Sequence, residues 1–213
     1  MTEIEIREQI ISAGKRMYEK NFGASNDGNI SGRLNDDQII ITPSGVSKGF
    51  MKPEDLIIVN MQGEFVAGKH KPSSELFMHL KVYQSRPDVY GICHAHPAYA
   101  TAFAVANISL DKPFLQEVVL TLGKIPVVEY GTTGTEDLYK PLLKYLTDHD
   151  AFLLANHGAL TVGKDVLDSY YKMETVEHSA KIYYLAKQLG HINLISEKDV
   201  EKLKQIRLGK NIK

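Results

Sequence analysis

The order in which strand-like and helix-like segments follow one another is the feature of this chain that most constrains its fold. Short runs rich in β-branched and aliphatic residues come early, separated by brief turns, at residues 38–42, 56–60 and 64–67. Later apolar runs alternate with helical patterns, at residues 89–96, 127–130, 151–156 and 159–162. This mixed order predicts an α/β (α+β) three-layer sandwich, in which helices flank a central, mainly antiparallel sheet.

Apolar residues at a spacing of three and four indicate the helices. We expect them at residues 2–20, 74–85, 97–106, 135–147, 164–189 and 196–207. Pro141 predicts a kink in the fourth of these helices, and Gly190 is a favoured residue just after the end of the fifth. The Gly-, Asn- and Ser-rich stretch at residues 21–33 should be a loop that passes into a short strand.

The composition narrows the classes of protein that remain. The 213 residues contain no repeat or long linker, so we expect a single domain over residues 1–213. A formal net charge of −1 argues against a nucleic-acid partner, and no apolar run approaches the roughly 20 residues of a membrane-spanning helix. The only cysteine, Cys93, lies in an apolar run and is expected to be buried. A lone cysteine is typical of a reducing compartment, which predicts a cytoplasmic protein.

Two histidines at the end of an apolar run suggest a metal site. His94 and His96 lie one residue apart, so on a strand they point to the same face with Cβ atoms about 7 Å apart. Imidazoles at that spacing can share one cation, although two polar residues at a strand end are the simpler interpretation. A third histidine, His157, interrupts another apolar run, where burial is costly unless the ring has a partner.

Three imidazoles with one open position are a frequent arrangement in catalytic zinc sites, so we predict a metal site at these histidines. A hydrogen-bonded core histidine is the alternative interpretation of His157. The other histidines lie in polar or helical contexts and are expected at the surface, at positions 70, 79, 149, 178 and 191.

Three short loops have the composition of an anion site, although ordinary turn or cap chemistry would also explain each of them. The first contains Gly28 and Asn29, and the second offers the Ser44 hydroxyl and free amides around Gly45. The third opens a helix at Ser73 and Ser74, where unpaired N–H groups favour a phosphate. Glu75 follows at once; a carboxylate there usually complements the helix dipole, but near a metal it can ligate or act as an acid/base.

Taken together, five motifs in a fixed order resemble the class II aldolase/adducin family. They are GNIS (28–31), TPSG (42–45), PSSE (72–75), HAHP (94–97) and NHG (156–158). Within the family they are most similar to the L-fuculose-phosphate aldolases. The resemblance implies a class II aldolase-like α/β/α fold with a central antiparallel sheet. It also implies a fourfold homotetramer with active sites between neighbouring subunits.

The resemblance assigns roles to the motif residues. It implies Zn²⁺, or another divalent cation, held by His94, His96 and His157. Glu75 would be the fourth metal ligand before substrate binds and the catalytic acid/base afterwards. The substrate phosphate would be bound by the residues of the three loops, Gly28, Asn29, Ser44, Gly45, Ser73 and Ser74.

The implied activity is the reversible cleavage of a small-molecule sugar phosphate. The substrate would be L-fuculose 1-phosphate or a related ketose such as 5-deoxyribulose 1-phosphate, and the products dihydroxyacetone phosphate and an aldehyde such as L-lactaldehyde. The alternatives within the family are a methylthioribulose-1-phosphate dehydratase, a sugar-phosphate epimerase and an adducin-like scaffold without activity. Epimerases carry Lys and Asp where this chain has Thr42 and Glu75, and scaffold members lack the three histidines, so the aldolase is favoured.

The chain also departs from the fuculose-phosphate aldolase pattern. Those enzymes have a catalytic tyrosine in the segment that corresponds to residues 113–119, and a functional tyrosine near the C-terminus. Neither tyrosine is present here; Glu117 is the acidic residue that could replace the first. The resemblance therefore leaves the identity of the sugar open.

Overall fold

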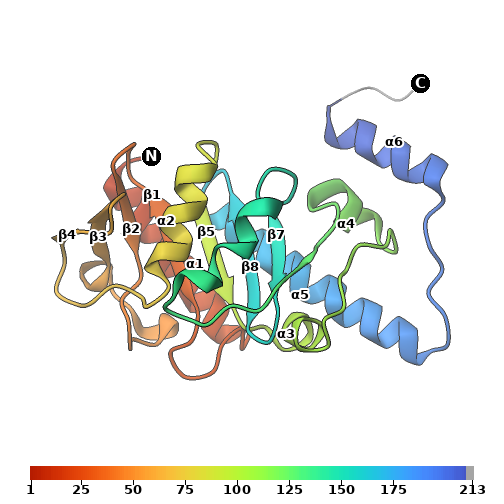
Figure 1. The fold of residues 1–213 in the computed structure, drawn as a ribbon, viewed down its shortest axis with the longest axis horizontal. Helices are drawn as coiled ribbons and strands as arrows, with labels where there is room; N and C mark the ends of the chain where they lie inside the picture. The colour runs from red at the N-terminus through yellow and green to blue at the C-terminus, as the bar shows by residue number, and fades with distance from the viewer. Residues whose placement is uncertain (210–213) are drawn as a thin grey trace.

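One eight-stranded sheet organises residues 1–209, the part of the chain that the computed structural model describes (Figure 1). The strand order is β4-β3-β2-β1-β5-β8-β7-β6, and every neighbouring pair is antiparallel except β6 and β7. The strands are β1 Asn29–Arg33, β2 Gln38–Ile41, β3 Ile57–Asn60, β4 Phe65–Ala67, β5 Gly91–Ala95, β6 Val127–Val128, β7 Ala151–Leu154 and β8 Gly158–Gly163. The predicted mainly antiparallel sheet is confirmed.

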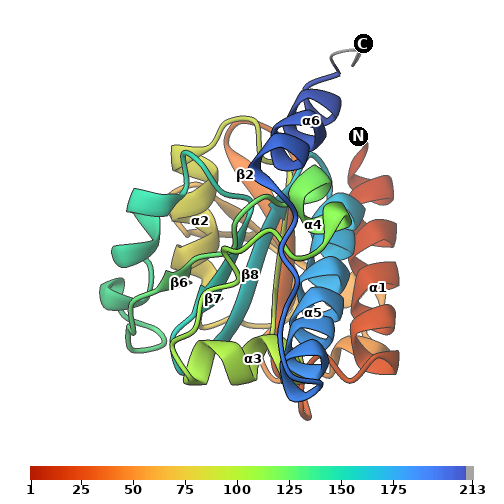
Figure 2. The same ribbon diagram turned by 90° about the vertical axis from the view of Figure 1, so that its right-hand side faces the viewer.

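Helices cover both faces of this sheet, as Figure 2 shows with α1 and α5 on one side and α2 on the other. The α-helices are α1 Glu3–Glu19, α2 Leu76–Ser85, α3 Ala98–Val105, α4 Gln116–Thr121, α5 Val166–Gln188 and α6 Glu197–Arg207. Short 3-10 helices are η1 Lys48–Phe50, η2 Pro53–Asp55, η3 Glu136–Leu138 and η4 Pro141–Tyr145.

Strand residues alternate between two apolar cores, which is why the sheet needs a cover on each face. In β2, Ile40 packs into the core shared with α1, α3, α4 and α5, whereas Ile39 and Ile41 pack into the core shared with α2, η3 and η4. In β7, Leu153 and Phe152 divide in the same way. The three-layer fold predicted from the order of elements is therefore confirmed.

Two element predictions are wrong. The helix expected at 135–147 is instead two 3-10 helices, η3 and η4, and Pro141 begins the second of them. Proline has no N–H to continue a helix that arrives from its N-terminal side, so it starts a new helix and does not merely kink one. Helix α4 was missed because its six residues, QEVVLT, are too short to establish a periodicity.

The C-terminal helix α6 stands away from the sheet and packs near α4 (Figures 1 and 2). None of its residues is buried, so the helix expected at 196–207 is present and exposed. Residues 210–213 of the predicted 1–213 domain lie outside the described residues. Among residues 1–209, no helix is both long and apolar enough to cross a bilayer.

Candidate active site

The first two histidines lie at the end of a central strand. His94 lies on β5, which ends at Ala95, and His96 is the first residue after the strand. Strand β5 pairs with β1 on one side and with β8 on the other, and the register places His94 opposite Asn29. His94 is completely buried, whereas the ring of His96 is about one quarter exposed. Of the predicted pair, His96 therefore lines a cavity, and His94 is buried beside it.

The third histidine lies in the tight turn between β7 and β8. The backbone N–H of His157 donates to the carbonyl of Leu154 at 3.0 Å, and Asn156 adopts a left-handed conformation with φ of 56°. Gly158 follows because no side chain fits there: a Cβ at this position would lie 2.5 Å from Cδ2 of His96. The NHG sequence thus brings His157 over the end of β5.

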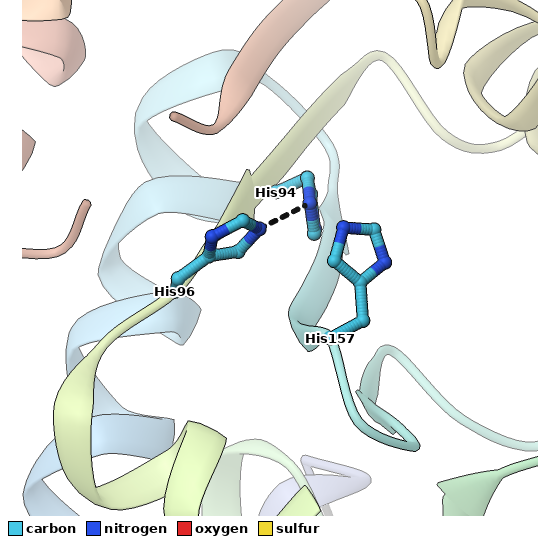
Figure 3. Close-up of side chains that lie close together, drawn as sticks. All are labelled: His94, His96 and His157. Atoms are coloured by element: carbon cyan, nitrogen blue, oxygen red, sulfur yellow. Dashed lines mark hydrogen bonds between the residues drawn. The ribbon is translucent and has the colours of Figure 1, made fainter. Parts of the chain in front are cut away.

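The three imidazoles converge from these separate elements, as Figure 3 shows. One ligand nitrogen from each of His94, His96 and His157 lies within 4.8 Å of the others. The dashed line in Figure 3 joins Nε2 of His96 to Nε2 of His94, 3.1 Å apart. The carboxylate of Glu75, at the start of α2, completes the group, with Oε2 3.1 Å from Nε2 of His94 and Oε1 3.1 Å from Nε2 of His157. We call these four residues the metal half of the site.

The hydrogen bonding of His94 fits a metal ligand. Its Nδ1 lies 2.9 Å from the carbonyl oxygen of Ala159 and must carry the hydrogen, because a carbonyl oxygen only accepts. Burial lowers the pKa of His94 to about 3, so its Nε2 is a bare lone pair at neutral pH. That lone pair faces the Glu75 carboxylate, an acceptor facing an acceptor, and a shared cation would resolve the conflict.

The charges of the surrounding groups agree with this assignment. Burial alone would raise the pKa of Glu75, but contacts with His94, His157 and Asn29 outweigh it and hold the pKa well below its ordinary value. Burial lowers the pKa of His96, with a smaller contribution from His157. An ionised carboxylate beside neutral imidazoles is the donor set that divalent zinc and similar metals bind.

A buried chain of hydrogen bonds holds Glu75 from behind. Nδ2 of Asn29 donates to Glu75 at 2.8 Å, so Oδ1 of Asn29 accepts from Nε2 of His79 at 2.5 Å. Nδ1 of His79 then accepts from the Ser31 hydroxyl at 2.6 Å, which accepts from the phenol of Tyr83 at 2.9 Å. Each donor direction follows from the carboxylate, which only accepts.

The surface prediction for His79 is therefore wrong, because its side chain is fully buried. The signal was present in the sequence: Glu75, His79 and Tyr83 are four residues apart and share one face of α2. Among the other histidines predicted at the surface, His149 is half-buried, and the exposed ones are those at positions 70, 178 and 191.

The residues predicted to bind an anion meet on the other side of Glu75. We call them the anion half of the site: Gly28, Asn29, Ser44, Gly45, Ser73 and Ser74. All six line one cavity of about 360 Å³, together with Glu75, His96 and His157. Gly28 and Gly45 have positive φ angles of 80° and 74°, and a Cβ at Gly28 would lie 2.8 Å from the carbonyl oxygen of His94.

The sequence predicted free backbone amides around Gly45, but in the structure one amide of that loop already has a partner. The N–H of Ser44 donates to the carbonyl of Lys71 at 2.9 Å, and a β-bridge joins Pro43 to Pro72. The TPSG and PSSE loops are therefore tied to each other. The hydroxyl of Ser73 accepts from the N–H of Glu75 at 3.2 Å and so belongs to the start of α2.

The cavity also has wall residues that no motif indicated. Thr133 comes from the loop after β6, and Lys48 from η1. Asp27 lies 3.5 Å from Nδ1 of His96. Glu117, the suggested replacement for the missing tyrosine, is exposed on α4 and is not among the residues that line this cavity.

The three-layer α/β fold therefore carries three converging histidines and a carboxylate, a candidate metal site at one cavity. The chain belongs to the class II aldolase and adducin family: residues 8–184 match the family model described as Class II Aldolase and Adducin N-terminal domain.

Individual relatives carry different names. A 5-deoxy-D-ribulose 1-phosphate aldolase of Bacillus thuringiensis serovar kurstaki is 34% identical over 200 residues, 92% of each chain. A 3-oxo-tetronate 4-phosphate decarboxylase of Haemophilus influenzae is 32% identical over 208 residues, 94% of this chain and 98% of the relative. A solved L-fuculose 1-phosphate aldolase aligns with a TM-score of 0.88 and 32% identity over 95% of each chain. These relatives confirm the predicted family and fold, and they place lyases among its members.

Proposed function

We propose that this protein is a metal-dependent aldolase that reversibly cleaves a ketose 1-phosphate into dihydroxyacetone phosphate and an aldehyde. One observation carries the proposal: the anion half opens into the same 360 Å³ cavity as Glu75, His96 and His157. A phosphorylated substrate in this cavity would have its phosphate in the loops and its carbonyl near the metal half. The similarity to a 5-deoxyribulose 1-phosphate aldolase and an L-fuculose 1-phosphate aldolase supports the same substrate class.

We further propose zinc as the metal, with cobalt and manganese as alternatives for the same donor set. His94, His96 and His157 would hold it, with Glu75 as fourth ligand in the absence of substrate. When bound there, the cation would supply a Lewis acid that polarises the substrate carbonyl.

The protein's own groups would bind the substrate and move its protons. Cleavage breaks the C3–C4 bond: the C4 hydroxyl loses its proton and becomes the aldehyde, the electron pair stays on C3, and C3 then gains a proton. Glu75 would exchange the C3 proton, because it lies between the metal half and the anion half. Asn29 holds Glu75 in place, and the anion half orients the substrate by its phosphate.

Decarboxylation is a second candidate, favoured by the relative named 3-oxo-tetronate 4-phosphate decarboxylase. Loss of C1 as CO₂ from a 3-oxo acid 4-phosphate leaves the electron pair on C2. This carbon is next to the ketone and is the third carbon counted from the phosphorylated one, as C3 is in a ketose 1-phosphate. The remaining fragment is dihydroxyacetone phosphate, as in aldol cleavage. Both reactions therefore need the same charge stabilised at the same place, and they differ only in the group that departs.

The sugar-phosphate epimerase and the methylthioribulose-1-phosphate dehydratase are less favoured. Thr42 and Glu75 stand where epimerases carry Lys and Asp. A non-enzymatic scaffold is the least favoured alternative, because it has no need for four converging ligand groups.

The first test measures metal and turnover together. The purified protein should contain about one zinc per chain, lose ketose 1-phosphate cleavage when a chelator removes it, and recover cleavage when zinc returns. A panel of ketose 1-phosphates and a 3-oxo acid 4-phosphate, with the aldehyde or CO₂ identified, separates the two candidates. A protein without stoichiometric metal, or without cleavage of any member of the panel, would refute the proposal.

A second test isolates the step that both candidates share. Dihydroxyacetone phosphate alone, incubated with the zinc-loaded protein in D₂O, should exchange one hydrogen of the hydroxymethyl carbon. Aldolase and decarboxylase activity both predict this exchange, since both leave charge on that carbon. Cleavage without such exchange would contradict the role proposed for Glu75.

We also propose a homotetramer in the cytoplasm with active sites between neighbouring subunits. The support is the resemblance, the lone buried Cys93 and a second cavity of about 540 Å³ beside Glu75, lined by the half-exposed Phe77. Sedimentation velocity should give four chains per particle, and a monomer would contradict the interface site.

A further inference from the structure

Lys48 is a buried cation at the edge of the candidate anion pocket. It begins η1, just after the TPSG loop, and only 5% of the residue is exposed. Lys48 lines the same cavity as Gly28, Ser44 and Gly45. Lysine is rarely buried without a partner of opposite charge, so this position calls for a physical explanation.

The partners of its ammonium group are backbone carbonyls and not carboxylates. Nζ donates to the carbonyl of Asn26 at 2.7 Å and to that of Val46 at 3.0 Å. Asn26 precedes the first anion loop and Val46 follows the second, so the ammonium lies between the two. An ammonium has three donors, and two hydrogen bonds leave one of them available. Within residues 1–209, no carboxylate lies in ion-pair distance of Nζ.

The charges around the cavity show what is missing from the anion half. All six of its residues are neutral side chains or glycines. Along the described cavity wall, Asp27 and Glu75 are acidic, His96 and His157 belong to the metal half, and Lys48 is the remaining basic residue. A phosphate dianion bound there would meet two carboxylates and would need a fixed positive charge close by.

We propose that the ammonium group of Lys48 is the counter-charge that binds the phosphate of the substrate, an inference that rests on the proposed function. Two of its hydrogens hold the GNIS and TPSG loops together, and the third is directed to the phosphoryl oxygens. Lys48 is thus a specificity residue for phosphorylated substrates.

The titration of Lys48 agrees with this assignment. Burial lowers the pKa of Lys48 to about 8, opposed by the attraction of Asp27. The free protein therefore holds this charge at an energetic cost, and a bound dianion would offset it.

The competing explanation is that Lys48 only ties two loops. Lys48→Gln separates the two roles, because an amide can still donate to both carbonyls but carries no charge. Lys48→Met removes both the charge and the two bonds. Lys52→Met removes a charge from an exposed lysine four residues away and serves as the matched control.

The experiment titrates inorganic phosphate into each zinc-loaded protein by calorimetry at pH 7.0, and repeats the titration with dihydroxyacetone and dihydroxyacetone phosphate. Lys48→Gln and Lys48→Met should weaken phosphate and dihydroxyacetone phosphate by roughly tenfold to hundredfold. Dihydroxyacetone affinity and zinc content should stay within about twofold, and Lys52→Met should match the unmodified protein.

Phosphate affinity within twofold of the unmodified protein in Lys48→Gln would overturn the proposal. Equal weakening of dihydroxyacetone and its phosphate would also overturn it, since that is the result of a loosened loop. If Lys48→Gln does not fold, the same criteria apply to Lys48→Met, in which an apolar side chain replaces the buried ammonium. Phosphate binding needs no turnover, so the two proposals can fail separately. If the unmodified protein binds phosphate but cleaves no substrate, and the Lys48 variants lose phosphate binding, the role of Lys48 is supported and the proposed reaction is refuted.

Discussion

The two halves of the candidate site are held in contrasting ways. In the metal half, His94 lies on a central strand, bonded to Ala159, and Glu75 is anchored by a buried chain that reaches Tyr83. In the anion half, every residue except Asn29, which begins β1, lies on a loop, and Gly28 and Gly45 shape two of these loops by their positive φ angles. Regular elements fix side-chain positions more tightly than loops do. The metal half should therefore respond to substitutions that change chemistry, and the anion half to substitutions that change loop geometry or charge.

The largest effect is expected from Glu75→Gln in the metal half. Glutamine preserves the size of the side chain but can neither accept a proton nor carry a charge. Loss of general acid–base catalysis typically costs 10²- to 10⁴-fold, so kcat should fall by about that factor, while inorganic phosphate should bind at least as tightly as before. Steady-state kinetics and phosphate titration measure the two quantities. Turnover within tenfold of the unmodified protein would show that another group moves the proton.

A pair of glycine substitutions compares the halves directly. Gly28→Ala adds a Cβ 2.8 Å from the carbonyl oxygen of His94, so it should weaken both zinc and phosphate binding. Gly45→Ala has the same kind of positive φ angle but nothing within 4 Å of its Cβ. It should therefore carry only the backbone cost, roughly 1–2 kcal/mol, and weaken phosphate alone.

Zinc titration and thermal unfolding of the two variants make this comparison measurable. Gly28→Ala should be the less stable of the two proteins and the only one with reduced zinc affinity. Equal zinc affinity in both would mean that the two halves are mechanically independent.

His79→Phe tests whether the buried chain positions Glu75. Phenylalanine fills the space but leaves Asn29 and Ser31 without their partner, at a cost of about 1–3 kcal/mol in unfolding free energy. Freed from His79, the Asn29 amide no longer has a fixed orientation toward Glu75. We expect kcat to fall roughly tenfold, as is typical for loss of a supporting hydrogen bond, with KM for the phosphorylated substrate unchanged. A lower stability with unchanged kcat would limit His79 to a structural role.

The last comparison concerns Lys48 and pH, and its effect appears only outside the neutral range. The pKa of Lys48 is about 8 when folded, below the ordinary 10.5, so the unfolded chain binds more protons between these values. The unmodified protein should therefore gain stability relative to Lys48→Met as pH rises from 8 to 10.5, by up to roughly 3 kcal/mol. Denaturant unfolding of both proteins across this range measures the difference. A gap that does not change with pH would mean that Lys48 has an ordinary pKa.

The sequence predicted most where a local pattern and a tertiary role coincide. The HAHP and NHG motifs combine apolar strands with polar ends, and all three histidines meet in the structure. The sheet was predictable because β2, β3 and β7 are continuous apolar runs, the pattern of strands that, as here, pack into a core on each face. The loops of the anion half were recognised from glycines and hydroxyls, which are local properties.

What the sequence could not reveal depends on contacts between distant segments. Nothing in the sequence around Lys48 distinguishes it from a surface lysine. Its burial depends on η1, which places its ammonium group between the carbonyls of Asn26 and Val46. The backbone N–H of Ser44 was predicted to be free, but in the structure it donates to the carbonyl of Lys71. His79 was assigned to the surface because its burial depends on Ser31 and Asn29, nearly fifty residues upstream.

The pairing of Asn29 with His94 across β1 and β5 has a consequence for folding. A slip of one residue in that pairing would turn Asn29 away from Glu75 and dismantle the ligand set, because neighbouring residues on a strand face opposite ways. A cation that binds only the aligned sheet would stabilise it over every slipped alternative by mass action. Metal binding would then favour, during folding, the chains in which β1 and β5 are paired in the native register.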